Sequence, residues 1–133
     1  MSDVGEREKQ TQDRVVRLFR DILGYRYLGN WIDRDCNSNI EPELLRDFLE
    51  KRMYDSGIIS RAMHHLDKIA NDTGKTLYER NRDVYEALRY GVNVKPEVGV
   101  KTHTVWLVDW QHPESNDFAI AEEVTIPAKD SST

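Results

Sequence analysis

The chain has 133 residues, a length that suits one domain with a hydrophobic core of its own. Its 38% hydrophobic and 32% charged residues exclude the low-hydrophobicity composition of disordered proteins. The formal net charge of -5 excludes the generally basic surface of many nucleic-acid-binding proteins, although 19 Lys and Arg residues leave room for local basic patches.

The cysteine content and the apolar runs bear on location. Cys36 is the only cysteine, so no intrachain disulfide can form, which fits a reducing compartment. The charged start "MSDVGEREKQ" is not a signal peptide, and no apolar run is long enough to span a bilayer. We therefore expect a soluble, cytoplasmic protein with no membrane partner.

The first two thirds of the chain predict four helices. The first lies in "EREKQTQDRVVRLFRDILGYRY" and ends near Gly24, and "YRYLGNWIDRDCNSN" follows as a connector. The next three lie in "IEPELLRDFLEKRMY", in "GIISRAMHHLDKIAN" with a cap at Asp55 or Ser56, and in "LYERNRDVYEALRY". The predicted inward-facing residues are Val15, Leu18, Phe19 and Ile22; Leu44, Leu45, Phe48 and Leu49; Ile59, Ala62, Leu66 and Ile69; and Leu77, Val84 and Leu88.

From Gly91 the sequence period changes to that of strands. A short strand ends at Pro96, and residues 104–110 and 117–126 are close enough to form an antiparallel hairpin. The predicted class is α+β, with four N-terminal helices followed by a small, mostly antiparallel sheet. We expect a domain over 1–126 and a flexible tail over 127–133. An open apolar edge on the last strand should be covered by the tail, a helix or another chain.

Three sequence features could indicate a functional site, and each supports one weakly. "TGKT" at 73–76 lacks the earlier glycine of a phosphate loop, because Ile69 stands there, and a helix precedes it in place of a strand. We interpret it as a helix-connecting turn. His64 and His65 are neighbours on a helix and point about 100° apart, so a shared metal is not expected. Cys36 has no CxxC partner, and we expect it to be a free thiol.

Charged residues give two further candidates. Arg7, Arg14 and Arg17 lie along one side of the first helix, where they either contact DNA phosphates or form a solvated face. Glu122 falls on the apolar face of the last strand, and Asp109 shares a face with apolar residues of the strand before it. Each acid is either an edge charge or salt bridge, or a carboxylate near a metal-dependent site. Trp106 and Trp110 are interpreted as core or interface anchors.

Four phrases, taken in order, carry a resemblance to a known family. They are "EREKQTQDRVVRLFRDILGYRYLGNW", "NSNIEPELLRDFL", "LYERNRDVYEALRYGVNVKPEVG" and "TVWLVDWQHPESNDFAIAEEVTI". In order and spacing they resemble the N-terminus of the R (restriction, HsdR-type) subunit of type I restriction–modification enzymes. The resemblance covers about residues 5–126.

The resemblance implies a fold and an activity. The R subunit joins an N-terminal PD-(D/E)XK nuclease to a DNA-translocating ATPase motor and a helical C-terminal part. It works with methyltransferase and specificity subunits and cleaves unmodified DNA using magnesium and ATP hydrolysis, in a system that also uses S-adenosylmethionine. In such a nuclease, acids hold a divalent metal that activates water, and a lysine positions that water.

This sequence departs from the family pattern after its last strand. The family continues with a strand that carries the Asp of the PD motif and another that carries the ExK pair, whereas the sequence has neither a PD dipeptide nor an ExK triplet. We therefore expect an incomplete nuclease domain, the N-terminal fragment of an R subunit, inactive when alone. It should bind no metal or other cofactor itself, and Mg²⁺ and ATP are implied for the complete subunit.

The resemblance also suggests one catalytic residue and a set of partners. Glu6, on the first helix, matches the place where such nucleases often carry an acid near the metal, with Gln10 as a helper; the helix dipole alone also favours a glutamate there. The implied partners are the methyltransferase and specificity subunits, and DNA through the complete subunit. The alternative is a stand-alone, non-catalytic binding or regulatory module that engages the complex or DNA.

Overall fold

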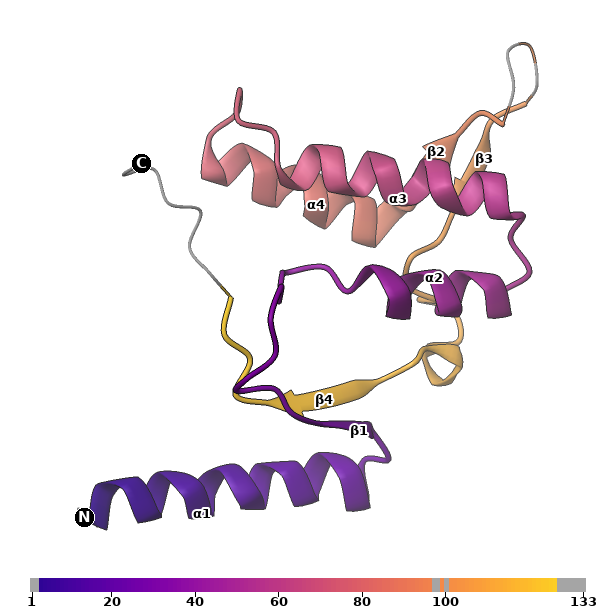
Figure 1. Ribbon diagram of the computed structural model, residues 1–133. Helices are drawn as coiled ribbons and strands as arrows, with labels where there is room; N and C mark the ends of the chain where they lie inside the picture. The colour runs from indigo at the N-terminus through magenta and orange to yellow at the C-terminus, as the bar shows by residue number, and fades with distance from the viewer. Residues whose placement is uncertain (1–2, 97–98, 100, 127–133) are drawn as a thin grey trace. The chain divides into compact units, whose positions relative to one another are not determined.

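The computed structural model describes residues 3–96, 99 and 101–126, so the predicted tail at 127–133 lies outside the described residues (Figure 1). In chain order the elements are α1 (Asp3–Arg17), the π-helical turn η1 (Leu18–Ile22), β1 (Arg26–Asn30), α2 (Pro42–Lys51), α3 (Ser56–Ala70), α4 (Leu77–Tyr90), β2 (Val92–Val94), β3 (His103–Val105), the 3-10 turn η2 (Pro113–Ser115) and β4 (Ala119–Glu122). The predicted α+β class, with helices and a small sheet that includes an antiparallel pair, is confirmed.

The chain divides into two compact units. Unit 1 is Met1–Asn39 with Asp117–Thr133, and unit 2 is Ile40–Asn116. Unit 2 holds α2, α3, α4, β2, β3 and η2, while unit 1 holds α1, η1, β1 and β4. The single domain over 1–126 stays a prediction, and each unit is described separately below.

The helices of unit 2 begin where the sequence places their caps. Pro42 opens α2, where a missing N–H costs nothing. The Asp55 side chain accepts a hydrogen bond from the Gly57 N–H at 3.1 Å, which satisfies an otherwise unpaired donor at the start of α3. At α4, the Thr76 hydroxyl accepts the N–H of Glu79, and the Glu79 carboxylate accepts the N–H of Thr76. The "TGKT" segment is thus the predicted turn between two helices.

The core of unit 2 combines the inner faces of α2 and α3 with the two short strands. Its buried residues are Leu49, Ile59, Ala62, Leu66, Ala87, Val92, Val94, Val105 and Leu107. The predicted inward face of α3 is confirmed, with Ile69 packed against the core. For α4 the predicted inward position of Val84 is confirmed, because Val84 packs against the core. The prediction is wrong at Leu77 and Leu88, which are exposed, because α4 buries Ala87.

Strands β2 and β3 form the antiparallel pair. Val92 lies opposite Val105, and Val94 opposite His103. Gly91 leads into β2 with φ of 83°, a left-handed conformation that favours glycine. A Cβ at Gly91 would lie 2.7 Å from Cγ2 of Thr104, so the close approach of β3 also requires glycine.

In unit 1, β1 and β4 lie side by side and run parallel, with Tyr27 opposite Ile120 and Asn30 opposite Glu122 (Figure 1). The predicted hairpin between 104–110 and 117–126 is therefore wrong. The last strand pairs with part of the segment predicted as a connector, and β3 ends at Val105. A register shift between Tyr27 and Gly29 marks a bulge in β1, and a bulge is what a glycine within a strand often indicates.

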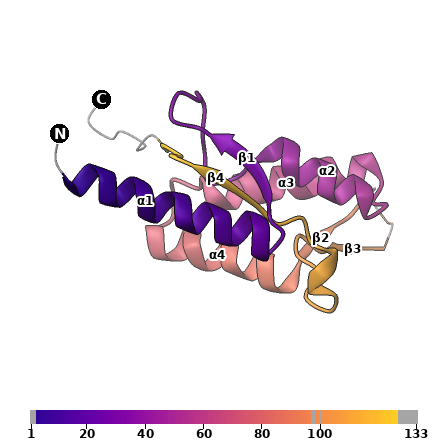
Figure 2. The same ribbon diagram turned by 90° about the horizontal axis from the view of Figure 1, so that it is seen from below.

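Helix α1 runs beside β4 in unit 1 and buries Val16 (Figure 2). The predicted face is wrong at Val15, Leu18 and Ile22, which are exposed. For Leu18 and Ile22 the cause is the π-helical turn η1, whose wider hydrogen-bond ring rotates the residues after Arg17 away from the α-helical register. On α1 itself, Val16 is buried in place of Val15. Gly24, with φ of 76°, ends the helix as predicted.

Three aromatic rings connect the helix end to both strands of unit 1. The ring centroids of Phe19 and Tyr25 lie 4.9 Å apart, edge to face, and those of Tyr25 and Phe118 lie 5.2 Å apart, stacked. The backbone N–H of Arg26 donates to the carbonyl of Phe118 at 2.9 Å. These contacts hold η1 next to the start of the parallel pair.

Candidate functional site

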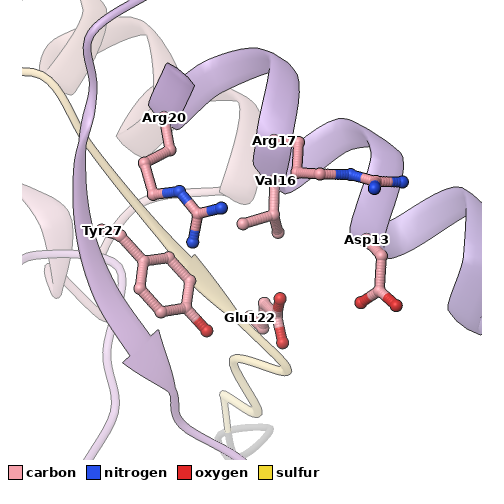
Figure 3. A pocket seen from close by; sticks show the side chains of 6 residues that line it. All are labelled: Asp13, Val16, Arg17, Arg20, Tyr27 and Glu122. Atoms are coloured by element: carbon pink, nitrogen blue, oxygen red, sulfur yellow. The ribbon is translucent and has the colours of Figure 1, made fainter.

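A pocket of about 320 Å³ opens in unit 1 between the helix and the strand pair (Figure 3). Helix α1 and the turn η1 supply one side, and β1 and β4 supply the other. The lining residues are Asp13, Val16, Arg17, Arg20, Tyr27 and Glu122. Val16 is the apolar member of the lining, and the other five side chains are polar or charged, so the pocket suits a polar ligand.

Glu122 is the last residue of β4, and it lines the pocket. Its backbone carbonyl accepts the N–H of Trp31 at 2.8 Å, and its carboxylate accepts the side-chain N–H of Asn30 at 3.4 Å. Glu123 follows with φ of 53°, which ends the strand. The half-buried Glu122 thus sits at a fixed strand end, facing Tyr27 and Arg20 (Figure 3).

Arg20 is held on the opposite wall of the pocket. Its Nε donates to Oδ1 of Asp21 at 2.9 Å, and its guanidinium carbon lies 5.8 Å from the ring centroid of Tyr27. The bond to Asp21 raises the pKa of Arg20, with smaller contributions from Tyr27 and Glu122. In return, the bond to Arg20 lowers the pKa of Asp21. Arg20 therefore stays a cation facing the pocket.

The charges of the pocket do not match a magnesium site. Asp13 and Glu122 are its acids, and Arg17 and Arg20 add an equal number of cations that repel a divalent ion. Within 3–96, 99 and 101–126, no group of three or more His, Cys, Asp or Glu residues is placed to hold a metal. The pocket is better matched to a ligand that carries both acidic and basic or hydrogen-bonding groups.

The site residues predicted on α1 do not all lie at the pocket. Glu6, Arg7, Arg14 and Arg17 are all exposed. Arg17 lines the pocket, whereas Glu6, Arg7 and Arg14 do not. Helical geometry puts Glu6 within about 20° of Arg17 in projection and about 10 Å from Asp13 along the axis, whereas Arg14 and Arg7 lie about 60° and about 80° from Arg17.

Sequence reasoning missed Asp13, Arg20 and Tyr27. Asp13, Arg17 and Arg20 recur at i, i+4 and i+7, a spacing that places them along one side of a helix and was available as a signal. Tyr27 had no such signal, because its position depends on the long-range pairing of β1 with β4.

The second candidate acid, Asp109, has structural contacts in unit 2. Its Oδ2 accepts from Nη1 of Arg52 at 2.9 Å, and its Oδ1 accepts the backbone N–H groups of Gln111 and His112. The bond from the His112 N–H, followed by that from Arg52, lowers the pKa of Asp109. These contacts match the salt-bridge interpretation and fix the turn that follows β3.

The remaining candidates stand apart from the pocket. His64 and His65 are exposed on α3, and Cys36 is an exposed free thiol with φ of 61°. Among the described residues, no helix is long and apolar enough to cross a membrane.

The comparison with protein families decides the relationship of the chain. A family model described as "Type I restriction enzyme R protein N terminus" matches residues 5–133. The chain belongs to this family. The search of curated proteins and the search of solved structures each returned no match.

Membership in the R protein N-terminus family confirms the resemblance found in the sequence and extends it to residue 133. The family match spans the segments that build the pocket: α1 from residue 5 onward, β1 and β4. The pocket is thus part of an R protein N terminus from a type I restriction system.

Proposed function

We propose that this chain serves as the N-terminal region of an R subunit whose complete form cleaves unmodified double-stranded DNA. The proposed setting is an ATP-dependent complex with methyltransferase and specificity subunits. The observation that supports it is the family match over residues 5–133. The net charge of -5 agrees with a chain that acts within a protein assembly rather than one that binds free DNA tightly.

We also propose that the chain is catalytically inactive when alone. The sequence contains no PD dipeptide and no ExK triplet, the residues that would hold metal and position water in the proposed nuclease. The balanced charges of Asp13, Arg17, Arg20 and Glu122 do not supply a substitute metal site. Mg²⁺ and ATP are accordingly assigned to the complete subunit.

The experiment combines a cleavage assay with a binding assay. Plasmid DNA incubated with the chain and Mg²⁺ should stay intact, whereas purified methyltransferase–specificity complex should retain the chain on an affinity resin. Robust cleavage by the chain alone would contradict the proposed inactivity, and failure to bind the complex would contradict the proposed assembly. Competition between the chain and a complete R subunit would favour a regulatory module.

Glu6 provides a residue-level test in the complete subunit. We expect Glu6→Gln to lower DNA cleavage at least about tenfold, because an acid that supports the metal loses its charge. Glu8→Gln is the matched control, since Glu8 is also exposed on α1 but points about 160° away in helical projection. Equal cleavage by both variants would remove Glu6 from the proposed site.

A further inference from the structure

The outer face of α4 carries a regular series of large side chains. Tyr78, Arg82, Tyr85 and Arg89 recur at i, i+4, i+7 and i+11, which places them along one side of the helix. Tyr78 is 75% exposed and Tyr85 is 60% exposed, because the opposite side of α4 packs into the core of unit 2. The core therefore does not account for these tyrosines.

Trp110 extends this series beyond the helix. Its indole Nε1–H donates to the carbonyl of Leu88 at 2.8 Å, which attaches the ring to the end of α4 and leaves it 49% exposed. The guanidinium carbon of Arg89 lies 5.4 Å from the ring centroid of Trp110 and 5.4 Å from that of Tyr90. We name the set Tyr78, Arg82, Tyr85, Arg89 and Trp110 the α4 stripe.

The composition of the α4 stripe is that of the centre of a protein interface. Tyrosine, tryptophan and arginine are the residue types that most often dominate binding energy when they become buried. The hydrogen bond to Leu88 already holds the Trp110 ring in one orientation, so little side-chain entropy is lost when a partner covers it. The stripe thus combines exposed aromatic side chains with a Trp110 ring that is already held in place before a partner binds.

The charges of the α4 stripe indicate what the partner carries. Arg82 and Arg89 are its only charged members, and no carboxylate of a described residue forms an ion pair with Arg89. The neighbouring acids are engaged within the chain: Asp83 accepts Nζ of Lys75 at 2.7 Å and pairs with Nη2 of Arg82 at 3.4 Å, and Glu79 closes the capping box of Thr76. A carboxylate from a partner would complete the guanidinium group of Arg89.

We propose that the α4 stripe is a docking surface for a carboxylate-bearing protein surface, that of the methyltransferase–specificity complex. The choice of this complex rests on the proposed function. Nucleic acid is the less favoured occupant, because its continuous row of phosphates would also lie against the acids that flank the stripe, whereas a protein surface can present a carboxylate to Arg89 alone. A second copy of the chain is also disfavoured, because a twofold antiparallel contact through α4 sets the flank that bears Glu79 and Glu86 against itself.

The test measures binding of the full chain to purified methyltransferase–specificity complex by biolayer interferometry. We expect Arg89→Glu and Tyr85→Ala each to weaken binding at least about tenfold. Lys68→Glu is the matched control for Arg89→Glu, because Lys68 is an exposed cation on α3 and the change in charge is the same. It should bind within about twofold of the unmodified chain. Circular dichroism and thermal unfolding confirm that each variant is folded.

Each outcome supports or overturns the docking surface. If the unmodified chain binds and the stripe variants bind equally well, the docking surface is wrong and the proposed function stands. If the unmodified chain does not bind the complex, both are wrong. Binding to nucleic acid is measured separately, by fluorescence anisotropy with a labelled 20-base DNA single strand and with its duplex. Loss of oligonucleotide binding in Arg89→Glu, with complex binding retained, would assign the stripe to nucleic acid and overturn protein docking.

Discussion

Asp109 shows how a single carboxylate can organise a turn. It connects Arg52, at the end of α2, to the backbone N–H groups of Gln111 and His112. A charged acceptor makes each of these hydrogen bonds stronger than a neutral one. The acid therefore couples the helical part of unit 2 to the turn after β3.

The lowered pKa of Asp109 predicts a pH-dependent stability. Because the folded pKa lies below that of the unfolded chain, the carboxylate stabilises the folded state above about pH 4 and loses this effect as pH falls through the folded value. We expect Asp109→Asn to lower the free energy of unfolding in urea more at pH 7 than at pH 3. The control is Asp47→Asn, an exposed acid on α2. A loss that is the same at both pH values would contradict the assignment.

Gly91 is the residue whose replacement the backbone tolerates least. Its φ of 83° and the 2.7 Å approach of a built Cβ to Thr104 predict that Gly91→Ala costs more than about 1 kcal/mol in the free energy of unfolding. Thr104→Ser removes the obstructing methyl group and keeps the hydroxyl that donates to Asn93. The double variant should recover part of the loss in a denaturant titration, and a purely additive result would point to φ alone.

At the scale of elements, the capping box of α4 allows the contribution of a helix N-terminus to the free energy of unfolding to be measured. Thr76→Ala removes the acceptor for the Glu79 N–H, and we expect a loss of about 1 kcal/mol in the free energy of unfolding. Thr73→Ala, an exposed threonine in the same turn, should change stability by less than about 0.5 kcal/mol. Equal effects of the two variants, measured by thermal unfolding, would mean that the cap does not limit the stability of α4.

Local signals predicted the helices well and the strand pairing poorly. The caps at Asp55 and Thr76 and the face of Ile59, Ala62 and Leu66 depend on neighbours within a few residues, so the sequence carries them directly. The pairing of β1 with β4 joins residues 92 or 93 positions apart, and the glycine-bearing "RYLGN" has little strand character. Closeness along the chain instead favours a hairpin between 104–110 and 117–126, and this prediction is wrong.

The candidate site was predictable in part for the same reason. Arg17 and Glu122 were singled out from their charge and position, and the structure brings them to one pocket. Arg7 and Arg14 were grouped with Arg17, but neither of them lines the pocket. Tyr27 enters the pocket only through tertiary pairing, which no local pattern specifies.

At the scale of the whole chain, buried apolar residues are distributed unevenly. Among the described residues, Val16 is the one buried hydrophobic in unit 1, and the others lie in unit 2. Unit 2 has the hydrophobic core, and it is also one continuous segment of the chain. Stability of the chain therefore depends chiefly on unit 2.

This distribution predicts that residues 40–116 fold when expressed alone. The fragment should show helical circular dichroism and a single cooperative unfolding transition. Leu49→Ala, which truncates a fully buried side chain, should lower its free energy of unfolding by about 2–5 kcal/mol. The exposed Leu77→Ala is the control, with a change within about 0.5 kcal/mol. A fragment without a cooperative transition would show that unit 2 requires unit 1.

The parallel pairing of β1 with β4 sets an order of events during synthesis. β1 leaves the ribosome early, and its partner arrives after all of unit 2 has been made. Closing a loop of some ninety flexible residues costs more entropy than closing one whose middle has already folded. We therefore expect unit 2 to form first and unit 1 last. Until translation reaches β4, the edge of β1 is unpaired and can form hydrogen bonds with strands of other chains.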